Sequence, residues 1–357
     1  METKGKRKSR ALAALLTLAM AFALLPVSAY AGEPVNIQDA LTGVLDYLHN
    51  AEYAVFGGEW AALAINRGGR ADAAWNNKYL EALETYIEEE AYSVDAASGK
   101  VTLDEGKTTE NARVVLALTS MGIDASQFRG YDLVSQVSDK ITAQSVNGAV
   151  YILLSLNSGD YSDRAFHDVC IDSLLENQED DGGWGWGDGA GSEADLTAMA
   201  LQALAPYEQK PGVASAVRAA LAFLAEQQDP ETGGFASWGS ESAESAAQVI
   251  VALTALGNDT TPGLSLDKAV ENLLSFRDGT TGGFISGWSG AVDSMSSEQA
   301  AYALVAYDRY VKGKNSLYDM SDASAGKKAN LIIISAAALF AIAVLSAFLV
   351  FRIRRLR

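Results

Sequence analysis

The chain has 357 residues, of which 27 are basic and 45 acidic, and its formal net charge at pH 7 is −18. A surface this acidic repels polyanions, so nucleic acid and anionic lipid surfaces are not expected as partners. Because Cys170 is the single cysteine, the sequence excludes an internal disulfide and a thiolate metal cluster, and no metal site is expected.

The first 31 residues have the layout of a secretory signal. Basic residues between Lys4 and Arg10 precede an apolar run, and the small-residue site Ala29-Tyr30-Ala31 follows it. We expect cleavage after Ala31. Once this signal and the basic C-terminal tail are set aside, residues 32–326 carry 16 basic and 44 acidic residues, a net charge of −28.

Apolar residues at helical spacing predict helices over residues 37–48, 59–67, 79–91, 108–121 and 146–157. Glycines end several of these segments, as Gly68 and Gly69 do after the run EWAALAINR. No regular alternation of polar and apolar residues between hairpin turns is present, so strands are not expected. The body of the protein is predicted to be all-α.

A glycine-rich turn followed by an apolar helix occurs three times. The second glycine of the turn is Gly183, Gly234 or Gly283, so the copies are 51 and 49 residues apart. Repeats of this length bury their apolar faces by stacking on their neighbours. Dividing the exported body by this period gives about six helix hairpins, which form either an open superhelix or a closed ring of inner and outer helices.

Two short motifs carry a resemblance to a known family. The segment QEDDGGW, from Gln178 to Trp184, resembles the QxxxGxW repeat of the squalene cyclase and protein prenyltransferase superfamily. Phe235 and Phe284 occupy the tryptophan position in the later copies, and the run DLTA from Asp195 resembles the D-x-T-A segment of triterpene cyclases. The resemblance implies a single α/α toroid over residues 32–315, in which the glutamine and aromatic side chains stabilise the turns.

In a closed ring every inner helix begins at the same mouth, and acidic residues collect there: Glu59, Glu110, Asp195, Glu244 and Glu298. They either offset the helix dipoles and cap free N–H groups, or line the cavity. Polar residues in otherwise apolar helices join them, because an unpaired polar group there is costly. The predicted ligand site comprises Glu59, Trp60, Glu110, Arg113, Asn147, Asp195, Thr197, Gln248, Gln299 and Tyr302.

One aligned column of the repeats contains Arg113, Gln248 and Gln299. These side chains either present a polar band to the lumen or form hydrogen bonds between neighbouring helices. Asp195 is the one candidate catalytic acid, since the resemblance implies that the matching residue of triterpene cyclases protonates an alkene or epoxide. The chain lacks the DxDD cluster and the second helical barrel of those enzymes, and it lacks the zinc ligands of prenyltransferases.

Three functions therefore remain open: a module that binds a small molecule or a surface protein partner in or on its cavity, a cyclase-like enzyme, and a structural or adhesive domain. The body is also distantly similar to the α-toroid of the cobalamin carriers transcobalamin and intrinsic factor, which implies a corrinoid as the one candidate cofactor. No β-rich lid domain follows residue 315. We expect a non-catalytic binding module.

The C-terminal segment predicts a membrane anchor. Leu331–Phe351 is a run of 21 residues without a charge, long enough to cross a bilayer as a helix, and four arginines follow it. We expect a linker over residues 316–330, a transmembrane helix over 331–351 and a cytoplasmic basic tail over 352–357. The body is then held at the cell membrane on its outer side.

Overall fold

The computed structural model describes residues 36–50, 52–107, 109–137, 142–159, 161, 164–187, 191–237, 239–257 and 261–323. The helices all belong to one compact unit that begins at Ile37. Within these residues, no helix combines the length and the apolar character that a membrane span requires. The predicted signal over residues 1–31 and the predicted span over residues 331–351 lie outside the described residues.

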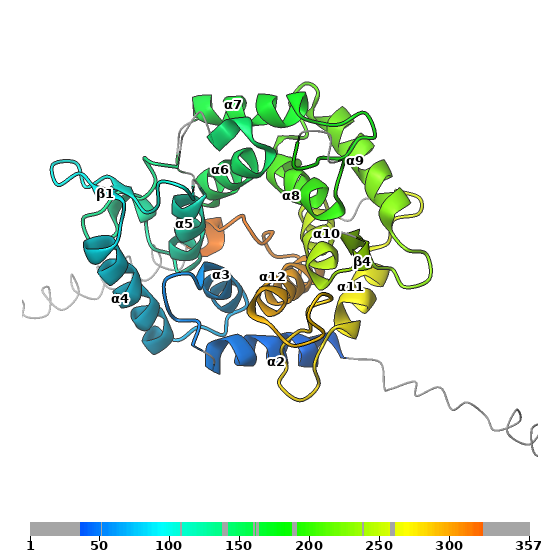
Figure 1. Cartoon of the computed structure of the whole chain (residues 1–357), viewed down its shortest axis with the longest axis horizontal. Helices are drawn as coiled ribbons and strands as arrows, with labels where there is room; N and C mark the ends of the chain where they lie inside the picture. Colours follow the sequence, from blue (N-terminus) through cyan, green and yellow to red (C-terminus); the bar gives the residue numbers. More distant parts are fainter. Residues whose placement is uncertain are drawn as a thin grey trace, which may run out of the picture. The chain divides into compact units, whose positions relative to one another are not determined.

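Six helices of the described chain form a closed inner ring (Figure 1). Each inner helix contacts the next one in sequence, and the last, α12, returns to contact the first, α3. The inner helices are α3 (Glu59–Arg67), α5 (Glu110–Ser120), α6 (Val146–Ser158), α8 (Ala194–Leu204), α10 (Ala243–Ala255) and α12 (Ser294–Val311). The closed ring, rather than an open superhelix, is the arrangement that the repeats adopt.

An outer layer of helices surrounds this ring. The outer helices are α2 (Ile37–Asn50), α4 (Ala73–Glu89), α7 (Arg164–Glu176), α9 (Val213–Gln227) and α11 (Leu266–Ser275). They are amphipathic: α11 buries Leu266, Ala269, Val270, Leu273 and Leu274, which lie on one stripe of the helix. The all-α toroid expected from the sequence is confirmed in this part of the chain.

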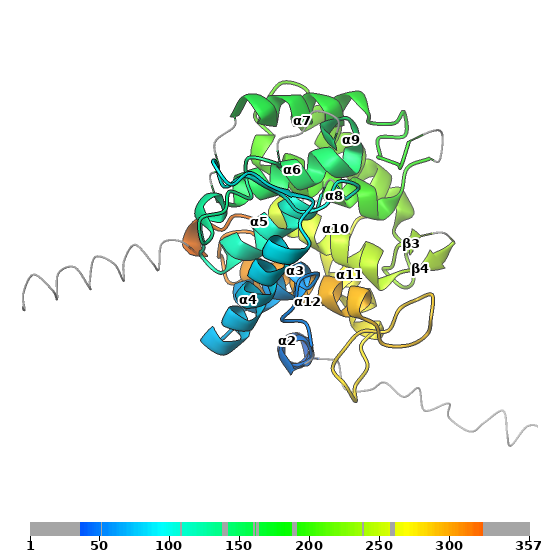
Figure 2. The same ribbon diagram turned by 60° about the vertical axis from the view of Figure 1, so that its left-hand side comes forward.

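Two details differ from the sequence expectation. Between α5 and α6 the described residues hold only the short 3₁₀ helices η1 (Ala125–Gln127) and η2 (Thr142–Gln144), so five outer helices serve six inner ones. Short antiparallel hairpins are also present, β1 (Ser93–Val94) with β2 (Val101–Thr102) and β3 (Ala236–Ser237) with β4 (Ser240–Glu241). Figure 2 shows the β3–β4 hairpin projecting beside α10 and α11. Strands this short leave no alternating pattern in the sequence.

The glycine turns stack each repeat on the next outer helix. Gly182, Gly233 and Gly282 have positive φ angles of 90°, 74° and 82°, which glycine adopts without strain. A Cβ at these positions would lie 2.7, 2.5 and 2.8 Å from a backbone carbonyl oxygen of α9, α11 and α2, respectively. The third turn therefore lies on α2, the first helix of the described residues, which is how the ring closes.

Side chains at the start of each turn connect it to the same outer helices. The Gln178 amide donates to the carbonyl oxygens of Gly182, at 2.7 Å, and Ala216, at 2.9 Å. Gln228 repeats this pattern in the second copy. In the third copy Arg277 replaces the glutamine and donates to the Asp39 carbonyl at 3.2 Å. The aromatic residues Trp184, Phe235 and Phe284 are fully buried, so the turn motif has a structural role.

The two ends of the ring differ, and we call them the mouth and the closed end. The mouth is the end at which the first turns of α3, α5 and α12 lie together, since Glu59 interacts electrostatically with both Glu110 and Glu298. At the closed end the last turns of α6, α8 and α10 surround residues 316–319. Figure 1 shows the segment after α12, in orange, crossing the opening of the ring.

Candidate functional site

Glu59 is the most deeply buried acid of the mouth. It is the first residue of α3 and has no exposed surface. Its Oε1 accepts hydrogen bonds from the Gly57 N–H at 2.9 Å and from the Tyr79 hydroxyl at 3.2 Å. Its Oε2 is buried and has no hydrogen-bond partner among the described residues. Burial raises the pKa of Glu59, the Gly57 N–H and Arg113 oppose the rise, and Glu110 adds to it.

Glu298 lies beside Glu59, although it comes from the first turns of α12, at the other end of the chain. Its side chain is 9% exposed. The pKa of Glu298 is raised to about 8: burial and then the Glu59 carboxyl raise it, and the Ala61 N–H and Arg113 partly oppose the rise. A carboxyl with this pKa holds its proton at neutral pH. Two buried carboxyls that repel each other share protons as a pair rather than titrating separately.

The one cation of this cluster is Arg113, on α5. Its guanidinium forms an ion pair with Glu110, which lies one turn earlier on the same helix and is 3% exposed. Although burial lowers it, the pKa of Arg113 is raised overall by the carboxylates of Glu110 and Glu59. Because three carboxyls face one guanidinium, the cluster is short of positive charge.

Asp195 lies apart from this cluster, in the first turn of α8. The N-terminal cap of that helix is Glu193, and Asp195 accepts from the Leu196 N–H at 2.9 Å. Burial raises the pKa of Asp195, the N–H groups of Leu196 and of Asp195 itself lower it, and Glu244 raises it. Its half-buried carboxyl therefore has the raised pKa of an acid, but it lacks a second carboxyl at hydrogen-bond distance among the described residues.

Gln248 and Gln299 form hydrogen bonds between neighbouring inner helices. The Gln248 amide donates to Gln299 Oε1 at 2.8 Å and to the Tyr302 hydroxyl at 2.6 Å. The Gln202 amide extends this network by donating to Gln248 Oε1 at 2.8 Å. Arg113, Gln248 and Gln299, which align in the repeats, were expected either to face the lumen or to form hydrogen bonds between helices. The two glutamines form hydrogen bonds between helices. Arg113 differs, since its observed ion pair is with Glu110.

Aromatic side chains fill the centre of the ring. The Trp60 ring on α3 lies 5.8 Å from the ring of Tyr151 on α6 and 5.7 Å from that of Tyr302 on α12. Helices α3 and α6 are not neighbours in the ring, so Trp60 and Tyr151 meet across the lumen. Tyr318, from the segment after α12, is buried close to Tyr151. This aromatic cluster connects α3, α6 and α12 across the lumen.

Besides Asp195, two more of the predicted site residues lie away from the cluster of Glu59, Glu110 and Glu298. Thr197 is fully buried and holds the glycine turn, since its hydroxyl accepts from the Trp184 N–H at 2.9 Å. Asn147 is half-buried at the start of α6 and lines a groove with Asn177 and Trp186 on the side of α8. The structure thus brings Glu59, Trp60, Glu110 and Arg113 together near the mouth, and it adds Glu298 and Tyr79, which the predicted site lacked.

The closed end contains residues that the sequence did not point to. Residues 316–323, predicted as part of a linker, pack against the ring and bury Leu317, Tyr318 and Met320. The Arg67 guanidinium donates to the carbonyl oxygens of Ser316 at 2.8 Å and Leu317 at 2.9 Å.

Asp322 is paired with both Arg67 and Arg309, each at 2.5 Å. Although burial raises the pKa of Asp322, hydrogen bonds from the two guanidinium groups lower it overall. Arg309 also donates to the Asn315 carbonyl at 2.8 Å, so both arginines hold the segment that follows α12.

Comparison with known proteins agrees with this architecture. Residues 190–307, about a third of the chain, match the model of the squalene-hopene cyclase C-terminal domain. A type II terpene cyclase from Scytonema, in complex with geranylgeranyl dihydroxybenzoate, is 12% identical in sequence and superposes with a TM-score of 0.53 over 80% of this chain and 98% of its own. The described part of the chain is a terpenoid cyclase-like toroid. Its resemblance to the squalene cyclase superfamily is thereby confirmed.

The terpenoid cyclase-like toroid also resembles enzymes of different chemistry. Unsaturated glucuronyl hydrolases from Bacillus sp. GL1 and Streptococcus agalactiae give TM-scores of 0.53 and 0.54 at 10% and 12% identity. They cover 80% and 79% of this chain, and 100% and 93% of their own chains are matched. No curated protein is significantly similar in sequence. Identities this low establish the fold alone, so function has to be argued from the site.

The chemistry available at the mouth of the toroid is that of carboxyl groups. Among the described residues no three His, Cys, Asp or Glu side chains are grouped as a metal site requires. The mouth offers hydrogen-bond acceptors, exchangeable protons and the face of Trp60.

Proposed function

We propose that the toroid binds a small cationic molecule at its mouth and that it does so without catalysis. The observation that carries the proposal is the buried carboxyl of Glu59, whose Oε2 has no hydrogen-bond partner in the described part of the chain. A buried polar atom without a partner is costly, and an N–H donor from a ligand removes that cost.

The charge of the cluster favours a cation over other ligands. Three buried carboxyl groups, those of Glu59, Glu110 and Glu298, lie near the single guanidinium of Arg113, and a bound cation can replace the proton that Glu298 holds at neutral pH. An ammonium group can donate three hydrogen bonds to such carboxylates. Trp60, which lies next to Glu59 on α3, supplies an aromatic face of the kind that attracts organic cations.

Calorimetric titration with benzylamine tests this proposal, with benzyl alcohol as a neutral ligand of nearly the same shape. We expect the purified full chain to bind benzylamine, and to bind benzyl alcohol at least about tenfold more weakly. Glu59→Gln should reduce benzylamine binding to a similar degree. The control is Glu176→Gln, at an exposed position on outer helix α7, which should change nothing. Equal binding of the amine and the alcohol would refute a cation site.

The cell-surface location is part of the same proposal. The signal over residues 1–31 and the membrane span over residues 331–351 are supported by the sequence. An exported, membrane-anchored toroid would present its acidic mouth to solutes outside the cell. A cysteine introduced at Ser321 should react with an impermeant maleimide on intact cells, whereas one added after Arg357 should react only after lysis.

A second candidate function is acid catalysis on a prenyl chain. Its support is the raised pKa of Asp195, together with a fold shared with a type II terpene cyclase. Incubation of the purified chain with geranylgeranyl diphosphate, followed by mass spectrometry, tests it. We expect no cyclised product. A product that Asp195→Asn abolishes would establish the enzyme, and absence of both product and ligand would favour a structural or adhesive domain.

A further inference from the structure

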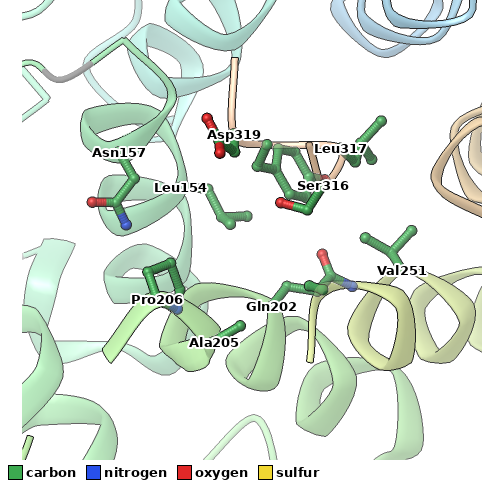
Figure 3. Close-up of a pocket in the computed structure, with 11 residues that line it drawn as sticks. Leu154, Asn157, Gln202, Ala205, Pro206, Val251, Ser316, Leu317 and Asp319 are labelled. Atoms are coloured by element: carbon green, nitrogen blue, oxygen red, sulfur yellow. The ribbon is translucent and has the colours of Figure 1, made fainter. Parts of the chain in front are cut away.

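We propose that the cavity at the closed end is a second binding site, separate from the mouth, for a small uncharged molecule with an apolar body and an amide-like pair of donor and acceptor. The cavity has a volume of about 350 Å³. It lies between the last turns of α6, α8 and α10 and the segment after α12 (Figure 3). This volume is at the lower end of the range typical of small-molecule sites.

Apolar side chains make up most of the cavity wall. Leu154, Val251 and Leu317 come from α6, α10 and the closing segment, and Ala205 and Ala255 leave space at the helix ends. Figure 3 shows Leu154, Val251 and Leu317 around the cavity. Such a wall favours an apolar ligand body and leaves specificity to the few polar atoms that reach the cavity.

Gln202 contributes the first of these polar atoms. Its side chain is 3% exposed, and its amide nitrogen donates both to the Gln248 carbonyl at 2.9 Å and to Gln248 Oε1 at 2.8 Å. Both neighbours are acceptors, so a flipped amide would place oxygen against oxygen, which determines the orientation. Gln202 Oε1 therefore remains as a buried acceptor, without a partner among the described residues.

Asn157, on α6, contributes the second polar atom of the cavity. Its Oδ1 accepts from the Tyr207 hydroxyl at 2.6 Å, and its buried Nδ2 has no partner in the part of the chain that the structure describes. Figure 3 shows Asn157 and Gln202 at separate places on the cavity wall. A ligand N–H can donate to Gln202 Oε1 and a ligand carbonyl oxygen can accept from Asn157 Nδ2, and a secondary amide carries both of these groups.

The negative charge at the opening of this cavity disfavours anionic ligands. Asp319 lines the cavity, is exposed and accepts from the Ser321 hydroxyl at 2.7 Å. Because a carboxylate is present and no basic side chain lines this cavity within the described residues, an anionic ligand would be repelled. A neutral amide with an apolar body can pack against the apolar wall and form hydrogen bonds with Asn157 Nδ2 and Gln202 Oε1.

Ligand-observed NMR with ε-caprolactam on the full chain in detergent tests this second site. N-Methylcaprolactam is the matched probe, since it keeps the shape and the carbonyl but lacks the N–H. We expect saturable binding of caprolactam and at least about tenfold weaker binding of the methylated probe. Gln202→Leu and Ala255→Phe should each abolish binding, the latter by filling the cavity from a half-exposed position that tolerates a larger side chain.

If Gln202→Leu does not fold, Ala255→Phe still tests the proposal, because it leaves the hydrogen bonds of Gln202 in place. Glu298→Gln serves as the control that separates the two ends of the ring: it should leave caprolactam binding unchanged and weaken benzylamine binding. Caprolactam binding that persists in Ala255→Phe would overturn the proposal, as would the absence of saturable binding to the folded wild-type chain.

Discussion

The mouth and the closed end of the ring have opposite ratios of buried carboxyl groups to guanidinium groups. At the mouth, three carboxyls share one guanidinium, and burial raises the pKa of Glu298 and Glu59. At the closed end, two guanidinium groups share the carboxylate of Asp322 and lower its pKa. One end therefore holds protons that a cation can displace, while the other is neutralised by its own arginines.

This difference in charge balance distinguishes a cluster that can bind a cation from a cluster that holds the ring closed. A charge cluster that is fully paired within the chain stabilises the fold and leaves nothing for a ligand to satisfy. A cluster with an unsatisfied buried oxygen, like that of Glu59, is costly to the fold and is relieved by a ligand. The comparison thus supports the proposal of cation binding at the mouth and indicates a structural role for the arginines of the closed end.

The largest expected effect concerns the scaffold that holds both ends in place. Trp184 is fully buried and donates from its indole nitrogen to the Leu174 carbonyl at 2.8 Å. Trp184→Ala should lower the free energy of unfolding by about 3–5 kcal/mol, measured by urea denaturation. The control is Trp186→Ala, two residues away and 56% exposed, which should change stability by less than about 0.5 kcal/mol. Similar values for both variants would show that the turn does not depend on the buried ring.

Arg67→Met should destabilise the closed end by about 2–4 kcal/mol, because it leaves Asp322 and several buried carbonyl oxygens with fewer partners. Hydrogen exchange should increase over residues 316–323 and stay unchanged at the mouth. Arg70→Met is the matched control, since its ion pair with Asp46 is exposed and contributes at most about 1 kcal/mol. If the two variants lost equal stability, the arginines would not be what holds this segment.

Glu298→Gln should change the free energy of unfolding by an amount that depends on pH. Because the folded-state pKa of Glu298 is raised to about 8, its contribution is fully present below the unfolded pKa and is lost as the pH rises through about 8. Chemical denaturation should therefore show the variant to be about 1–3 kcal/mol more stable than wild type at pH 8.5, with the difference vanishing toward pH 5.

Several charged or titratable groups interact with Glu298 and bear on this result: Glu59, Arg113, Tyr53 and Tyr302. Glu59→Gln in the wild-type chain should also weaken the pH dependence of stability, because it removes the carboxyl that helps to raise the pKa of Glu298. A stability difference that does not vary between pH 5 and 8.5 would mean that Glu298 ionises normally.

The smallest effect is expected at Asp195. Asp195→Asn keeps an oxygen that can accept from the Leu196 N–H, so the fold should lose only about 0.3–1 kcal/mol. Benzylamine binding should be unchanged, because Asp195 lies outside the Glu59–Glu298 cluster. A loss of benzylamine binding as large as that of Glu59→Gln would extend the ligand site to α8 and weaken the distinction between Asp195 and the cluster.

Much of the fold was predictable, because glycine turns repeat at intervals of 51 and 49 residues and need little context to be recognised. The third turn shows the limit of that argument. There Arg277 takes the place of the glutamine and donates to Asp39, a residue of the first helix. The sequence predicts the repeat, whereas the partner that closes the ring depends on the three-dimensional arrangement.

The site was predictable in its residue types but not in its pairing. Glu59 and Glu298 were both recognised as acids at the mouth, yet the raised pKa of Glu298 depends on burial against a residue far away in the sequence. Gln202 satisfied the same criterion that singled out Gln248, a polar residue in an apolar inner helix, and was missed. Leu317 and Tyr318 gave no periodic signal, because their burial depends on Arg67 and Arg309.

Proton release on ligand binding tests the central claim most directly. Benzylamine titrations at pH 7 in two buffers of different ionisation enthalpy give the number of protons released per ligand bound. The account predicts about one proton, displaced from the Glu59–Glu298 pair, and a value near zero in Glu298→Gln. Binding of benzylamine to the wild-type chain with no proton release would contradict the claim that the mouth exchanges a held proton for a cation.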